Sequence, residues 1–174
     1  FSEFEELLAK IKEAGITPLS QAYGEWSLLF IWEPVMSAYD PEYTRGLDDY
    51  TSKADGPGAS GSLQKLVDWA NAGYFGDNWL GVINSDDMIL GFTTGNAAMM
   101  VGGTWNISTI DQNNPDLNYG AFAIPAEDGT TGLVGTAANG FSINANTQNK
   151  EAAEAFVSYC ASKEGQTAWV QTIG

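Results

Sequence analysis

Carboxylates are the most numerous side chains in this sequence that could do chemistry. Aspartate and glutamate total 22 among 174 residues, whereas the chain contains no histidine and one cysteine, Cys160. A Ser/His/Asp or Cys/His catalytic set therefore cannot form within the chain. A glycoside hydrolase needs only two carboxylates, so that enzyme class stays open. Glu25 and Glu33 have aromatic neighbours, but nothing in the sequence singles out a pair, and we predict no catalytic residue.

Metal and nucleotide sites are not indicated by any motif. Asp111 to Asp116 is rich in oxygen ligands but lacks the glycine and the terminal glutamate of an EF-hand loop. Clustered cysteines for zinc are absent, as are the P-loop and the Gly-x-Gly-x-x-Gly fingerprint. We therefore predict neither a metal ion nor a cofactor.

The net charge narrows the choice of partners. Lysine and arginine total 7, so the formal charge is 7 − 22 = −15. A protein this acidic repels phosphate backbones and anionic membrane surfaces, which excludes nucleic acid as an expected partner. No apolar run is long enough to span a bilayer. Because the chain opens on Phe1 at an expected helix start, we expect it to be a fragment whose targeting segment lies elsewhere.

Aromatic side chains at two expected junctions suggest a different chemistry, the binding of sugars. The chain has 6 tryptophans, 7 tyrosines and 8 phenylalanines. Aromatic rings stack on the apolar faces of sugars, while amides and carboxylates bond the hydroxyls. Trp26 lies beside Tyr23 and Glu25 where a loop enters a helix. Trp105 follows two glycines and precedes Asn106, where a strand passes into a helix.

Hydrophobic periodicity predicts the elements that position these residues. Ser2 and Glu5 form a capping-box pattern at the first helix. Strands alternate with helices, which predicts an α/β fold with helices packed on a mixed sheet. We expect helices at 2–14, 26–38, 63–72, 85–94, 104–112, 152–160 and from 162, strands at 16–19, 97–101, 119–124 and 136–143, and an irregular segment at 40–59.

Several motifs, taken in order, resemble the group 1 extracellular solute-binding proteins of ABC importers. The resemblance covers nearly the whole chain. The matching segments are 1–4 with 14–18, 71–75, 92–99, 103–105, and 149–156 with 162–166.

The resemblance implies a periplasmic-binding-protein-like (type II) fold, two α/β lobes joined by a hinge with ligand between them. It implies that residues 1–128 belong to the second lobe and that 129–174 form the hinge crossing and return toward the first. Complete members are more than twice as long, so the chain would supply one side of the ligand cleft.

The resemblance also implies a function, the capture of a mono- or oligosaccharide for import. The implied partners are that carbohydrate and the transmembrane subunits of an ABC permease, and the implied location is the periplasm or, through a lipid anchor, the outer face of the membrane. The expected ligand-binding residues are Trp105, Trp26, Glu25, Asn106, Asn139 and Tyr23. Asn139 stands where the family usually has glycine. A carbohydrate-active enzyme and a sensor-associated binding module remain the alternatives.

Overall fold

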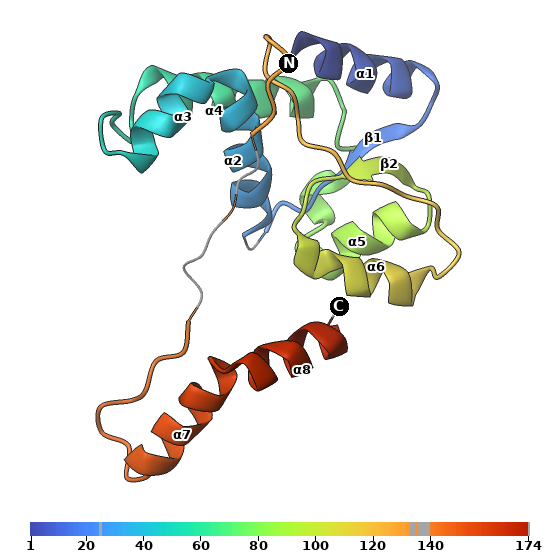
Figure 1. Ribbon diagram of the computed structural model, residues 1–174. Helices are drawn as coiled ribbons and strands as arrows, with labels where there is room; N and C mark the ends of the chain where they lie inside the picture. The colour runs from blue at the N-terminus through green and yellow to red at the C-terminus, as the bar shows by residue number, and fades with distance from the viewer. Residues whose placement is uncertain (25, 133–134, 136–139, 174) are drawn as a thin grey trace. The chain divides into compact units, whose positions relative to one another are not determined.

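The computed structural model describes residues 1–24, 26–132, 135 and 140–173 (Figure 1). The internal contacts of the chain divide it into two compact units, Phe1–Val134 (unit 1) and Gly135–Gly174 (unit 2). The assignment of residues 1–128 and 129–174 to two lobes of a receptor stays a prediction. Unit 1 includes every predicted site residue except Asn139.

Helices make up most of the described part of unit 1, and two short strands lie between them (Figure 1). This mixture of elements confirms the predicted α/β class. The helices are α1 (Ser2–Glu13), α2 (Ser27–Tyr39), α3 (Pro41–Asp48), α4 (Pro57–Asn71), α5 (Ser85–Thr93) and α6 (Ile107–Asn113), with 3-10 turns η1 (Trp79–Gly81) and η2 (Thr104–Asn106).

The two strands form a parallel pair, β1 (Thr17–Ser20) and β2 (Ala97–Met100). Both were predicted. The expected strand at 119–124 is wrong, because the segment has no strand partner among the described residues and is held by its side chains instead. The Tyr119 hydroxyl donates to Asp111 Oδ1 at 2.9 Å, and the Phe122 ring lies 6.1 Å from that of Phe4. The expected strand at 136–143 falls partly outside the described residues, and 140–143 form no strand.

The hydrophobic core of unit 1 lies where α1, α2 and α4 meet. Trp69 on α4 is 2% exposed, and its ring packs on Phe1 and Phe4. Ile31 and Val35, one turn apart on α2, are fully buried in the same cluster. The core therefore fixes the direction of α2, whose first turn follows the aromatic loop at 21–26.

The segment at 40–59 is more regular than predicted. Asp40 Oδ1 accepts a hydrogen bond from the Tyr43 N–H at 2.9 Å, and Pro41 occupies the first helical turn, so α3 begins there. An aspartate cap followed by proline is a start signal for a helix. This helix was not predicted from the sequence because the segment lacks a hydrophobic period. Helix α2 also continues through Pro34 to Tyr39.

The start of α1 differs from the predicted capping box. Ser2 is the first helical residue, and both its N–H and its hydroxyl donate to Glu127 Oε2, at 2.9 and 2.8 Å. Glu5 instead accepts hydrogen bonds from Lys65 and Trp69 on α4. Partners distant in sequence have replaced the local pair in both cases.

The contact between Ser2 and Glu127 predicts a pH effect. Hydrogen bonds from the Ser2 N–H and hydroxyl lower the pKa of Glu127, because they favour the ionised carboxylate. A lowered folded-state pKa gives stability that is present above the unfolded-state pKa and is lost as the pH falls through the folded-state pKa. By NMR we expect Glu127 to titrate below a model glutamate peptide and Ser2→Ala to raise its midpoint. An unchanged midpoint in Ser2→Ala would contradict this hydrogen bond.

Unit 2 contains two helices, α7 (Lys150–Cys160) and α8 (Lys163–Ile173). Ser162 Oγ accepts a hydrogen bond from the Gly165 N–H at 3.1 Å, as expected of the predicted cap. Cys160, near the end of α7, is half-buried. None of the helices in the described part of the chain is long and apolar enough to cross a membrane.

Candidate ligand-binding site

The topology of the sheet brings the two predicted aromatic segments to one edge. Ser20 pairs with Met100, so the loops that follow β1 and β2 leave the sheet side by side. The first loop leads through Tyr23 to Trp26, and the second leads through Gly103 to Trp105. Ligands of open α/β folds gather at the carboxyl ends of parallel strands, so the site begins where ligand contacts are expected.

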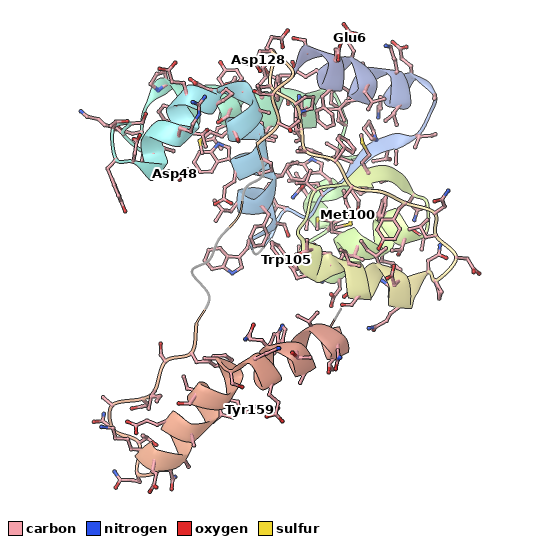
Figure 2. All side chains as sticks on the ribbon, in the orientation of Figure 1. Glu6, Asp48, Met100, Trp105, Asp128 and Tyr159 are labelled. Carbon is pink, nitrogen blue, oxygen red and sulfur yellow. The ribbon has the colours of Figure 1, made fainter. Side chains whose placement is uncertain are left out.

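Trp105 presents an exposed ring whose position is fixed by two neighbours. The side chain is 57% exposed, and Figure 2 labels it among the side chains of unit 1. Its ring lies against Gly103, where a Cβ atom would clash with it, and its centroid is 5.1 Å from that of Phe30 on α2 at a tilt of 52°. The indole is therefore held in place on one side and open to solvent on the other, which suits a stacking contact.

Helix α2 supplies a second exposed ring, one turn before Phe30. Trp26 caps the helix and is 69% exposed, and Phe30 follows one turn later on the same face. Phe30 contacts Trp105, and Trp26 lies one turn before Phe30 on the same face of α2. We call Trp26, Phe30 and Trp105 the aromatic platform. Sequence reasoning missed Phe30, although its spacing of four residues from Trp26 could have indicated it.

Tyr23 lies at the border between the β1 loop and the turn η1. Its backbone N–H donates to Val82 O at 2.7 Å, and its ring meets Trp79 edge-on with centroids 5.8 Å apart. The side chain is 52% exposed. Tyr23 thus adds an exposed phenol to the first loop. Its position is set by the backbone hydrogen bond to Val82 and by the contact with Trp79, and not by the aromatic platform.

Asn106 has a structural position rather than an open one. It is 7% exposed, and its Oδ1 accepts a hydrogen bond from the Gly103 N–H at 3.1 Å. This bond closes the turn that carries Trp105. The amide therefore positions the neighbouring ring, and its predicted contact with ligand stays a prediction.

Two further predicted residues lie outside the described residues, Glu25 and Asn139. Two other acids, Asp86 and Asp87, belong to the first turn of α5, whose N-cap is Asn84. Asn84 Oδ1 accepts a hydrogen bond from the Asp87 N–H at 2.8 Å. Their placement fits the capping region of a helix, where the macrodipole favours negative charge.

The chemistry of the described site is that of binding. Among residues 1–24, 26–132, 135 and 140–173, no three acidic or cysteine side chains come together as a metal site. The exposed groups are aromatic faces. Aromatic faces beside the carboxyl ends of strands are typical of ligand-binding sites in α/β proteins.

Comparison with known proteins identifies the family. The sequence model of the family described as bacterial extracellular solute-binding protein matches residues 1–167, and the chain therefore belongs to it. The chain is 27% identical to the multiple sugar-binding protein of Streptococcus mutans serotype c, covering 91% of this chain and 40% of that protein. A solved structure of a chitin oligosaccharide binding protein is 28% identical to this chain, with a TM-score of 0.61. The match covers 72% of this chain and 32% of the solved chain.

These comparisons confirm the predicted family and fold. The chain spans less than half the length of both relatives. Both are binding proteins by name, as is the family itself.

Proposed function

We propose that this chain is part of a receptor that captures a carbohydrate outside the cell for an ABC importer. The observation that supports it most is the exposed Trp105 ring, held against Gly103 and Phe30 at the carboxyl edge of the sheet. The names of the two relatives, a multiple sugar-binding protein and a chitin oligosaccharide binding protein, support the same ligand class.

In this proposal the aromatic platform stacks on the apolar faces of a mono- or oligosaccharide. Tyr23 and Glu25 bond hydroxyl groups of the ligand, and Asn106 holds the turn that carries Trp105. Asn139 stays a further candidate for a ligand contact. The ligand undergoes no reaction, because the receptor only binds and releases it. Stacking and hydrogen bonds together supply affinity without requiring a perturbed acid or base.

Transport requires that capture be reported to the membrane. We place residues 1–128 in the second lobe and 129–174 in the hinge and return toward the first. A ligand that contacts both lobes stabilises the closed arrangement by its differential affinity. The closed receptor then docks on the transmembrane subunits of the permease, from the periplasm or from a lipid anchor on the outer face of the membrane.

The proposal is tested by adding neutral sugars to the chain and following its tryptophan indole N–H resonances by NMR. Glucose, galactose, maltotriose, cellotriose and triacetylchitotriose form the panel. At least one should shift the resonances of Trp26 and Trp105 and leave those of the buried Trp69 and of Trp169 in unit 2 unchanged. If no sugar moves either platform resonance at saturating concentration, the carbohydrate function is wrong.

A matched assay addresses the enzyme alternative. The same sugars are incubated with the chain, and their products are followed by chromatography. We expect each oligosaccharide to be recovered intact, because the proposal contains no catalytic step. If a sugar is hydrolysed and a single carboxylate substitution abolishes that hydrolysis, the chain belongs to a glycoside hydrolase and the receptor proposal is wrong.

A further inference from the structure

The face of α2 that presents the aromatic platform also presents a carboxylate. Trp26, Phe30 and Glu33 follow one another at spacings of four and three residues, which places them on one side of the helix. Ile31 and Val35, on the opposite side of α2, are buried in the core. Glu33 therefore continues the stripe that begins with Trp26.

Glu33 has no partner of opposite charge among the residues that the structure describes. The side chain is half-buried, and it takes part in no hydrogen bond or ion pair within the described part of the chain. Other half-buried acids of unit 1 are paired: Glu5 accepts from Lys65 at 2.9 Å and from the Trp69 indole. A half-buried carboxylate without a partner is ready to accept hydrogen bonds from a ligand.

The positive charges of unit 1 lie on other elements. Segments 13–44 and 66–149 contain no lysine, arginine or histidine, and these segments supply the platform and Glu33. The basic residues of unit 1 lie on α1, α3, α4 and the α3–α4 connection. Lys10 pairs with Glu6, and Arg45 donates to Pro41 O. Figure 2 shows Glu6 on α1 at the far end of the unit from Trp105.

We propose that Glu33 is a ligand-binding residue that makes this site select neutral or amino sugars over acidic ones. The inference rests on the proposed carbohydrate function. Sugar hydroxyls and ammonium groups donate to the Glu33 carboxylate while the ring stacks on the platform. A uronate, sulfate or phosphate group in the same place meets the like charge of Glu33, which has no ion pair among the described residues, and this repulsion opposes binding.

The test compares each neutral trisaccharide with its own charged derivative. Maltotriose, cellotriose and triacetylchitotriose are titrated against the chain by NMR, followed by the C6-carboxylate forms of the first two and by deacetylated chitotriose. We expect the C6-carboxylate form to bind about tenfold or more weakly than its parent, the cost of an unpaired charge. Raising the salt concentration should narrow that ratio, because it screens the repulsion.

The variant Glu33→Gln assigns the selectivity to this side chain. We expect it to bring the carboxylate form to within about threefold of its neutral parent, because the amide still accepts from hydroxyls but no longer repels an anion. Deacetylated chitotriose should bind Glu33→Gln about tenfold more weakly than wild type, because the variant removes the charge pair between the sugar ammonium group and the carboxylate. Glu42→Gln on α3 removes the same charge from an exposed position and should leave all ratios unchanged.

Two results overturn the inference. If a carboxylate trisaccharide binds wild-type chain as tightly as its parent, or if Glu33→Gln changes the ratios no more than Glu42→Gln does, Glu33 does not select the ligand, although the carbohydrate function stands. If no trisaccharide of either kind binds, the proposed function fails and the inference fails with it.

Discussion

Trp105→Ala should weaken sugar binding by about thirtyfold, the largest loss expected from any single substitution on the platform. Central aromatic anchors of a binding surface typically lose roughly 2 kcal/mol or more on truncation. The indole is 57% exposed and backed by Phe30, so its open face is free for the ligand. The measurement is the titration midpoint of the best-binding neutral sugar, followed by the Trp26 indole resonance.

Trp169→Ala is the matched control for this substitution. Trp169 is also 57% exposed but belongs to α8 in unit 2. Both variants should unfold in urea within about 0.5 kcal/mol of wild type, since neither removes a buried side chain. Equal sugar affinity in the two variants would show that Trp105 is an ordinary surface residue.

Local patterns were enough to predict most elements of unit 1. The strands at Thr17–Ser20 and Ala97–Met100 and the helix at Ser85–Thr93 were expected from periodicity and turn residues. These signals lie within a few residues of the elements they specify. Once the two strands pair in parallel, the convergence of Tyr23, Trp26 and Trp105 at one edge follows from their positions after the strands.

The errors arose where partners distant in sequence decide the outcome. The Ser2 hydroxyl donates to Glu127, 125 positions away, and this contact replaces the local capping box expected from Ser2 and Glu5. The mostly apolar segment 119–124 was expected to be a strand but has no partner strand among the described residues. The ligand contact expected of Asn106 is a separate case and stays a prediction, while its amide oxygen accepts a hydrogen bond from the nearby Gly103 N–H. The burial of this polar side chain depends on that hydrogen bond and could not be predicted from residue type.

Trp69→Ala should destabilise unit 1 by about 3–5 kcal/mol, the range for removing a buried aromatic ring from a core. Trp69 is 2% exposed, and its ring stacks on Phe1 with centroids 6.1 Å apart and meets Phe4 at 5.7 Å. Its indole N–H also donates to Glu5 Oε1 at 2.9 Å. The substitution therefore removes apolar contacts and a hydrogen bond between α4 and α1 together.

Urea unfolding followed by far-ultraviolet circular dichroism measures this effect as a lower midpoint with an unchanged slope. Trp69→Phe retains most of the ring and loses the hydrogen bond, so it should destabilise unit 1 by only about 1–2 kcal/mol. Trp26→Ala removes an exposed indole and should stay within about 0.5 kcal/mol of wild type. A Trp69→Ala midpoint equal to that of Trp26→Ala would mean that the α1–α4 core does not stabilise unit 1. Because α2 packs on α4 in that core, the platform should lose its sugar-induced shifts at the same urea concentration at which the helices unfold.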